Sequence, residues 1–461
     1  MSPSAEATAL PAEPLLVDSS CDPSSDYTPV VPTPVPTLES LRAMPVEQQP
    51  RYSDPQQRRR VVQRLRVLAP LVRARQCDEL RSRLADVAGG HAFLLQGGDC
   101  AETFAGVRAD NIGNKVRVLS SMAAVMADAA GVPVVAVGRI AGQYAKPRSR
   151  RTETRDGVEL PSYRGDAVNG FEFTARARQH DPERLERMYR AAAETLELVA
   201  GTGRHLRVWA SHEALLLDYE HSLTRVDERS QLPYDLSGHL VWLGERTRRL
   251  DGAHVAFLRS VHNPLGVKLG PSATAQQAVA LAEALDPRRT PGRLTVITRM
   301  GAGRVRRLLP PIIKAVEATG RSVVWCCDPM HGNTFETANG YKTRSFHDIC
   351  AEVNGFFDVH EELGTRPGGV HVELTGDDVT ECLGGTDALA ESDLRDQISR
   401  ISAPTLLVAG EWDPVTTVAD AQAMQASIPG SKVAVVPASH LSNLEAPEAF
   451  ERAVLNFLAQ A

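Results

Sequence analysis

The sequence has little that would suit an oxidising compartment or a membrane. Its seven cysteines are odd in number and irregularly spaced, with Cys326 next to Cys327, so no disulfide framework of a small secreted protein is visible. Apolar runs such as VPVVAVG fall far short of the roughly 20 residues that a membrane-spanning helix needs. The sequence therefore favours a cytoplasmic protein that uses no disulfides.

An excess of positive charge is also missing. The formal net charge is -6 and the isoelectric point is near 6.1, so no global field attracts nucleic acid or an anionic membrane. Residues 1–37 contain no Arg or Lys and no apolar segment typical of a signal peptide, and they are rich in Pro and Ser. We interpret them as a disordered tail. An anionic ligand would have to be held by local clusters of Arg and Lys.

A regular alternation of short apolar runs and longer amphipathic stretches begins near residue 90. Each run ends in a polar residue before the next helical pattern starts. The runs occupy residues 92–100, 132–142, 206–213, 239–246, 264–271, 293–301, 322–332 and 368–378. Near-continuous apolar strands that alternate with helices indicate a parallel sheet, and eight such units predict an α/β fold closed into a (β/α)8 TIM barrel.

The polar residues at the strand ends are the candidates for chemistry, because barrel active sites lie at that face. They are Asp99, Cys100, Arg139, His212, Glu213, Glu245, Arg246, Lys268, Arg299, Asp328, His331 and Glu373. Cys, His and carboxylate together suit a divalent transition metal that keeps one coordination position open and acts there as a Lewis acid. For Cys100, the alternative is a small buried hydrophobe. For His331, the alternative is a packed core histidine.

The Arg and Lys residues at the strand ends follow apolar segments directly, so they would face one another across the barrel mouth. Positive charges gathered in this way need an anion to offset their repulsion. Guanidinium groups bind phosphate or carboxylate in a bidentate manner, and Lys adds a compact charge, so a phosphorylated carboxylate substrate would account for them. The loop GRIAGQYAKPRSR adds Lys146, Arg148 and Ser149, which could bind a second phosphate. The alternative for this loop is a solvated basic segment.

Several long motifs in one order resemble a known family. They are LRAMPVEQQPRY, QGGDCAETF, GRIAGQYAKPRS, SHEALLLDYE, WLGERTR, GVKLGP, RMG, DPMHGNT and GGVHVELTGDDVTECLGG. Together they are similar to class II (plant-type) 3-deoxy-D-arabino-heptulosonate 7-phosphate (DAHP) synthases over about residues 38–394. Family members condense phosphoenolpyruvate with erythrose 4-phosphate at the start of the shikimate pathway.

The resemblance implies roles for individual residues. Cys100, His331 and Glu373 would be ligands of a divalent metal, with Mn expected and Co, Fe or Zn as alternatives. Arg139, Glu245, Arg246, Lys268 and Arg299 would form the phosphoenolpyruvate pocket, with Arg139, Glu245 and Lys268 acting in catalysis. Lys146, Arg148 and Ser149 would approach erythrose 4-phosphate. In this reading the metal polarises the aldehyde, and the cations offset the charge of two phosphorylated substrates.

The resemblance also carries expectations about partners and regulation. It implies a homo-oligomer, a dimer or larger, and a chorismate mutase partner in some relatives. Feedback-regulated members have a helical insertion where this chain has only GTGRH at 201–205. We therefore expect no inhibition by aromatic amino acids through that insertion, as in members that serve secondary metabolism such as phenazine pathways.

The resemblance breaks down after residue 390. Family members continue from E-[ST]-D-L to CDPRLN, whose Asp is the fourth metal ligand, but a gapless continuation from ESDL at 391–394 places Ala403 there. The segment 391–461 instead resembles the C-terminal end of an α/β-hydrolase, most similar to 3-oxoadipate enol-lactonases, with Asp413 and His440 as the residues that match a catalytic triad. The chain contains no G-x-S-x-G nucleophile motif, so we assign this segment no hydrolytic activity.

These observations predict a disordered tail at 1–37, a class II synthase barrel at 38–390 and a fused, truncated β-α-β-α segment at 391–461. Losing one ligand should weaken metal binding and impair the synthase. Asp413 at the end of ISAPTLLVAGEWDP could replace the missing ligand only if its strand docked at the barrel mouth. The alternative function is a catalytically weak scaffold or regulatory partner, for example of chorismate mutase.

Overall fold

The fold is described from a computed structural model. It describes residues 34–155, 157–202, 207–336, 342–376, 382, 398–399, 401–413, 416–439 and 442–460. The tail at 1–33, the ESDL motif, the predicted boundary at 390 and His440 lie outside these residues. Among the described helices, none is both long and apolar enough to cross a membrane.

Eight parallel strands close into a barrel, which confirms the predicted architecture. The strands follow one another around the barrel in chain order and coincide with the eight apolar runs of the sequence. They are β1 (Phe93–Gly98), β2 (Val134–Arg139), β5 (Trp209–Glu213), β8 (Leu240–Leu243), β9 (Leu265–Leu269), β10 (Leu294–Thr298), β11 (Val324–Cys327) and β14 (Gly369–Glu373). Most of these residues are buried, as expected for strands covered on both faces.

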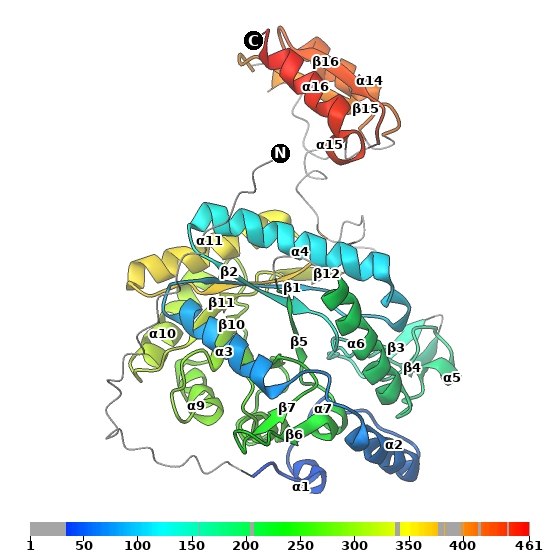
Figure 1. Cartoon of the computed structure of the whole chain (residues 1–461), viewed down its shortest axis with the longest axis vertical. Coiled ribbons are helices and arrows are strands. Elements are labelled where there is room, and N and C mark those ends of the chain that lie inside the picture. Colours follow the sequence, from blue (N-terminus) through cyan, green and yellow to red (C-terminus); the bar gives the residue numbers. More distant parts are fainter. Residues whose placement is uncertain are drawn as a thin grey trace, which may run out of the picture.

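A helix follows each of the first seven barrel strands and packs on the outside of the barrel (Figure 1). These helices are α4 (Ala109–Ala130), α6 (Arg184–Gly201), α7 (Leu217–Leu223), α8 (Ala253–Leu258), α9 (Ala275–Leu285), α10 (Val305–Glu317) and α11 (Phe346–Leu363). Local signals fix their ends: Thr274 and Ser345 cap α9 and α11 at their N-termini, and Gly131 and Gly364 end α4 and α11 in left-handed conformations.

The N-terminal extension consists of α1 (Leu38–Ala43), α2 (Pro55–Val67) and α3 (Ala74–Ala88). Helix α3 packs Leu80 and Leu84 into one cluster with residues of the barrel strands, among them Leu94. Gly292, which precedes β10, lies so close to α3 that an added Cβ would sit 1.9 Å from the carbonyl oxygen of Arg81. Helix α3 therefore closes the amino-terminal end of the barrel and leaves the carboxyl ends of the strands open for a site.

The loops on both sides of the barrel carry short hairpins and helices that the apolar pattern did not predict. They are β3 (Thr152–Arg155) with β4 (Val158–Pro161), β6 (Thr224–Val226) with β7 (Pro233–Asp235), β12 (Thr334–Glu336) with β13 (Lys342–Arg344), the 3-10 turn Phe104–Gly106 and α5 (Ala175–Arg178). Most strand residues of β3, β4 and β12 are exposed, so these hairpins have no apolar face from which a sequence pattern could predict them.

The C-terminal segment has its own small sheet. Strand β15 (Leu406–Gly410) pairs in parallel with β16 (Lys432–Val436), and helix α14 (Val418–Ser427) connects them. Helices α15 (Ser442–Glu445) and α16 (Pro447–Leu458) follow. The order β-α-β-α is the predicted one, and β15 is not a ninth strand of the barrel. Figure 1 draws this segment apart from the barrel.

Candidate active site

The strand register brings the predicted site residues to one end of the barrel. Strand β1 lies between β2 and β14, and Gly98 at its end is level with Arg139 on one side and Glu373 on the other. Cys100 follows two residues later. An added Cβ on Gly98 would sit 2.6 Å from the carbonyl oxygen of Arg139, so only glycine fits where these three strands end together. Lys268 lies near the end of β9 in the same mouth.

Arg139 organises this corner of the mouth. Its guanidinium donates to the carbonyl oxygens of Asp99 (3.1 Å) and Cys100 (3.4 Å) and to Oε1 of Glu373 (3.3 Å). A fourth contact, 2.6 Å, reaches Nε2 of His371, whose Nδ1 lies 2.8 Å from Oε1 of Gln96. Burial, followed by the neighbouring cations, holds the pKa of His371 well below its usual value, so the neutral ring accepts from Arg139.

His331 lies between two carboxylates. Its Nδ1 is 2.8 Å from Oδ2 of Asp328, and its Nε2 is 2.8 Å from Oε1 of Glu373. Burial would lower the pKa of His331, but the two carboxylates outweigh burial and raise it to about 9. Glu373 also accepts from Arg344, and the surrounding cations hold its pKa well below the usual value against the opposing effect of burial.

Lys268 is almost fully buried and is paired with one carboxylate. Its ammonium lies 2.7 Å from Oδ2 of Asp328 and 5.9 Å from the ring centre of Trp242, which Arg139 also faces at 5.6 Å. Burial lowers the pKa of Lys268, and the attraction of Asp328 opposes that change. Lys268 and Arg139 therefore present two cations to the interior of the mouth over one aromatic face.

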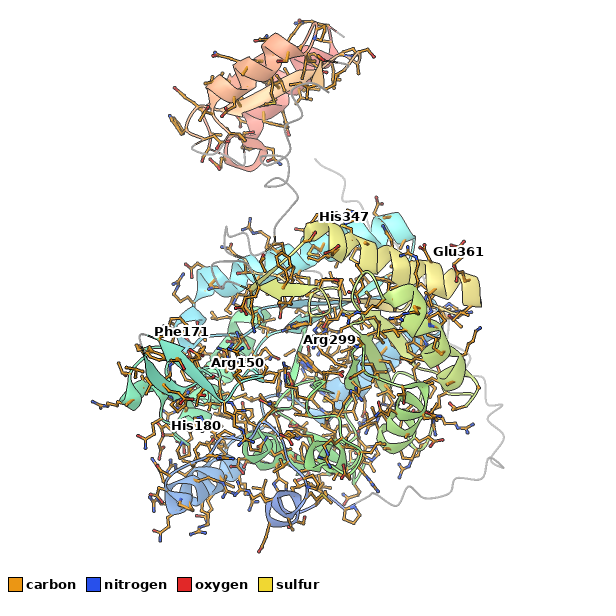
Figure 2. The ribbon with its side chains drawn as sticks, turned by 180° about the vertical axis from the view of Figure 1, so that it is seen from behind. Arg150, Phe171, His180, Arg299, His347 and Glu361 are labelled. Carbon is orange, nitrogen blue, oxygen red and sulfur yellow. The ribbon has the colours of Figure 1, made fainter. Side chains whose placement is uncertain are left out.

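The other predicted phosphoenolpyruvate residues line the rim. Glu245 accepts from both Nε (3.1 Å) and Nη2 (2.7 Å) of Arg248 and from the backbone N–H of Gly270 (2.7 Å). Arg246 is exposed, and Arg299, labelled near the middle of Figure 2, donates to the carbonyl oxygen of His331 at 2.5 Å. Glu245 is thus bound by protein groups, while Arg246 is exposed and Arg299 is half-buried.

The predicted erythrose 4-phosphate residues lie on the loop after β2. Lys146 and Arg148 are half-buried and Ser149 is exposed. Arg148 donates to Glu153 on β3 at 2.9 Å, so the hairpin holds its guanidinium. Figure 2 places the next residue, Arg150, beside the β3–β4 hairpin and away from Arg299. Lys146 and Arg148 therefore add two half-buried cations on a loop that follows a barrel strand.

The comparisons with known proteins decide the family. A family model described as "Class-II DAHP synthetase family" matches residues 36–205 and 200–409. A phospho-2-dehydro-3-deoxyheptonate aldolase of Streptomyces coelicolor is 52% identical over 416 residues, covering 79% of this chain and 92% of the relative. The AroG enzyme of the same description from Mycolicibacterium smegmatis is 45% identical over 425 residues, covering 80% of this chain and 91% of the relative.

The chain belongs to the class II DAHP synthase family. This confirms the family resemblance of the sequence, and it makes the chain an enzyme of the type that carries out the first step of the shikimate pathway. The family match ends at residue 409, inside β15, so it does not extend over the rest of the C-terminal segment. Class II DAHP synthases depend on a divalent metal in general, which makes the fit of the predicted ligands the next question.

The predicted metal ligands of this DAHP synthase fit a divalent metal by donor type, and two of them are adjacent. Nε2 of His331 and a carboxylate oxygen of Glu373 face each other at 2.8 Å, and the backbone carbonyl oxygen of Cys100 accepts from Arg139, which also donates to Glu373. In the part of the chain that the structure describes, however, no group of three or more metal-binding side chains is arranged around one point. The ring of His331 instead lies between the carboxylates of Asp328 and Glu373, and its two nitrogens contact them as those of a protonated imidazole would.

The structure does not bring Asp413 to the other predicted ligands. Asp413 follows β15 in the C-terminal segment, where its carboxylate accepts from the backbone N–H of Thr416 at 3.0 Å and from its hydroxyl at 2.6 Å. Ala403, the residue at the position of the family's fourth ligand, is exposed before β15. Its methyl group offers a metal no donor atom.

Two residues at the mouth were absent from the predicted site, and a third was a candidate without an assigned role. Arg344 reaches Glu373 from β13, a hairpin that no apolar pattern marks. His371 points inward from β14 and accepts from Arg139. Because side chains along a strand alternate between its two faces, the pattern GGVHVE could have indicated that His371 points inward. Glu213 was noted at a strand end without a role. Its Oε1 is buried and has no hydrogen-bond partner among the described residues.

Proposed function

We propose that this chain condenses phosphoenolpyruvate with erythrose 4-phosphate and water to give DAHP and phosphate. The observation that carries the proposal is the pair of buried cations, Arg139 and Lys268, over Trp242 at the end of the barrel that also holds His331 and Glu373. A phosphorylated carboxylate needs such cations in a site with little water. The test is consumption of phosphoenolpyruvate that requires erythrose 4-phosphate.

We propose that Cys100, His331 and Glu373 hold the metal, with Mn the expected ion and Co, Fe or Zn as alternatives. A bound divalent metal would polarise the aldehyde carbonyl of erythrose 4-phosphate. Because Ala403 supplies no fourth ligand, we expect weaker metal affinity and a lower activity than in relatives that have the Asp. The placement of Asp413 against Thr416 favours this reading over Asp413 as a substitute ligand.

In the proposed reaction, the C2–C3 double bond of phosphoenolpyruvate supplies the electron pair for a bond from C3 to the aldehyde carbon, and the aldehyde oxygen takes a proton to become a hydroxyl. Water adds at C2, and the C2–O bond to phosphate then breaks as the added hydroxyl gives its proton to the leaving phosphate, which leaves C2 as the ketone of DAHP. Arg139, Arg246, Lys268 and Arg299 bind the carboxylate and phosphate of phosphoenolpyruvate, and Glu245 orients Arg248 and the end of β9 at the rim. Lys146, Arg148 and Ser149 bind the phosphate of erythrose 4-phosphate. The water must lose a proton when its oxygen bonds to C2.

Glu213 is the residue we assign to that proton. Its carboxylate lies against Gly244, where an added Cβ would sit 2.0 Å from Oε1. Burial raises the pKa of Glu213, against the attraction of Lys268 and Arg139. A buried carboxylate with a raised pKa and an unpartnered oxygen next to the substrate cations has the properties of a general base.

The variant Glu213→Gln keeps the shape of the side chain and removes the base. We expect kcat to fall about a hundredfold, as is typical when a general base is lost, while the KM for phosphoenolpyruvate changes little. Steady-state kinetics with both substrates measure this. Glu283→Gln on the exposed face of α9 is the matched control, and an unchanged kcat in Glu213→Gln would show that another group takes the proton.

We also propose the broader roles that the resemblance implies. These are a homo-oligomer in the cytoplasm, a chorismate mutase partner, and a place in a secondary-metabolite route free of feedback by aromatic amino acids. The last is supported by the short connection from α6, which ends at Gly201, to β5, which begins at Trp209. For the C-terminal segment we propose a hydrolase remnant without hydrolytic activity; the support for this is the parallel β15–β16 pair with Asp413 after β15.

A further inference from the structure

A short N-terminal segment, residues 45–49, connects three loops of the barrel mouth. We call it the strap. The carbonyl oxygen of Pro45 accepts from the N–H of Ala253, after β8. The side chain of Gln48 bonds to Arg148, after β2, and the side chain of Gln49 bonds to the loop after β5. Since these loops all follow barrel strands, the strap crosses the face where the substrates bind.

Gln48 bonds to the backbone of Arg148 in both directions. Its Nε2 donates to the carbonyl oxygen of Arg148 at 3.1 Å, and its Oε1 accepts from the N–H of Arg148 at 3.0 Å. The side-chain amide of Gln48 thus makes the two hydrogen bonds to Arg148 that the backbone of a neighbouring β-strand would make. Gln48 itself has a φ of 60°, a left-handed conformation that a non-glycine residue rarely adopts. The strained backbone aims the side chain at the loop.

Arg164 ties the same residue to Lys146. Its guanidinium donates to the backbone carbonyl oxygens of Gln48 and Gln49 and, at 3.2 Å, to Oε1 of Gln48. The carbonyl oxygen of Arg164 accepts from the N–H of Lys146 at 3.0 Å. Gln48 therefore fixes the backbone of Arg148 directly, and it fixes the backbone of Lys146 through Arg164.

Gln49 makes the corresponding contact at the loop after β5. Its Nε2 donates to the carbonyl oxygen of Leu215 at 2.7 Å, and its Oε1 accepts from the N–H of Leu217 at 3.2 Å. The N–H of Leu215 in turn donates to the carbonyl oxygen of Glu213. Two consecutive glutamines therefore bind the backbones of two different mouth loops, one on each side of the strap.

We propose that Gln48 is a positioning residue that fixes the loop 146–149 for the phosphate of erythrose 4-phosphate. This inference rests on the proposed function and adds to it a residue outside the barrel that sets affinity for one of the two substrates. Gln48 does not touch the substrate. It acts by keeping the backbone of Lys146 and Arg148 in one conformation, so that binding does not have to order the loop.

The decisive variant is Gln48→Gly. Glycine adopts a φ of 60° without strain, so this change removes the two hydrogen bonds from the amide to Arg148 and the one from Arg164 to Oε1, and it leaves the backbone of the strap unstrained. We expect the KM for erythrose 4-phosphate to rise about tenfold, the loss that two ordinary hydrogen bonds to a loop would cause. The KM for phosphoenolpyruvate and the Tm should stay within the error of the unsubstituted chain. In hydrogen exchange, the Arg148 amide should exchange faster.

Gln231→Gly is the matched control. Gln231 is also left-handed, with a φ of 56°, and within the described part of the chain its side chain donates only to the carbonyl oxygen of Glu228 in the turn between β6 and β7. This control should change neither KM. An unchanged KM for erythrose 4-phosphate in an active Gln48→Gly variant, or equal rises in both KM values, would overturn the role of Gln48. Absence of turnover in the unsubstituted chain would instead refute the proposed function, and this role with it.

Discussion

Removing divalent metal from the purified chain with a chelator should abolish consumption of phosphoenolpyruvate, and adding Mn should restore it. The expected loss is at least a hundredfold, because aldehyde polarisation is a large part of the barrier in such a condensation. The proposed ligands Cys100, His331 and Glu373 are a donor set for a transition metal, and they lie at or just after the ends of β1, β11 and β14, where β14 pairs with both other strands.

Single ligand variants locate the metal. Cys100→Ser and His331→Asn should each lower the bound metal, measured by elemental analysis, along with turnover. Cys350→Ser changes an exposed cysteine on α11 and should change neither quantity. Asp413→Ala should also leave metal content unaltered. Metal retained in full by Cys100→Ser would place the site elsewhere, and metal lost in Asp413→Ala would make Asp413 the replacement for the missing fourth ligand.

Replacing Lys268 by Met should lower kcat/KM for phosphoenolpyruvate about a thousandfold. The ammonium of Lys268 is buried beside Trp242, and a preorganised charge in such a site is worth far more than one in water. Asp328, which lies 2.7 Å away, would be left with His331 as its cationic neighbour. The measurement is steady-state kinetics at saturating erythrose 4-phosphate, with a Tm for each variant.

Two further variants separate charge from folding. Lys268→Arg keeps the positive charge and should recover part of the lost activity, although the larger guanidinium cannot occupy the same place. Lys314→Met, on the exposed face of α10, should be indistinguishable from the unsubstituted chain. If Lys268→Met folds with a native Tm and turns over at the normal rate, Lys268 has no part in binding phosphoenolpyruvate.

The barrel could be predicted from the sequence because each strand is buried on both faces. The run that became β8 (Leu240–Leu243) consists only of apolar residues, all buried, and a closed sheet has no edge strand with an exposed side. The hairpin β12–β13 has no such pattern: Thr334, Phe335 and Glu336 are all exposed. It therefore escaped prediction, and with it Arg344, whose contact with Glu373 depends on that hairpin.

The site residues also divide into those that a sequence pattern locates and those that only tertiary contacts locate. The cations and ligands at strand ends, such as Arg139 and Glu373, were found because strand ends fix their location. Gln48 lies 100 residues from Arg148 in sequence, and its left-handed backbone leaves no sequence signal. Supporting groups of this kind follow from tertiary contacts alone. The role of Asp413 could not be judged from sequence either, because it depends on where β15 lies.

The rate of phosphate release with both substrates, measured across a Mn titration, tests the central claim most directly. The claim is that this chain is a working DAHP synthase with a weakened metal site. The full chain should be compared with a variant whose residues after Leu394 are replaced by a family-type ending containing CDPRLN. We predict turnover that requires both substrates and needs more Mn than the variant does. No turnover by the full chain at any Mn concentration, beside an active variant, would contradict the claim and favour a scaffold or regulatory protein.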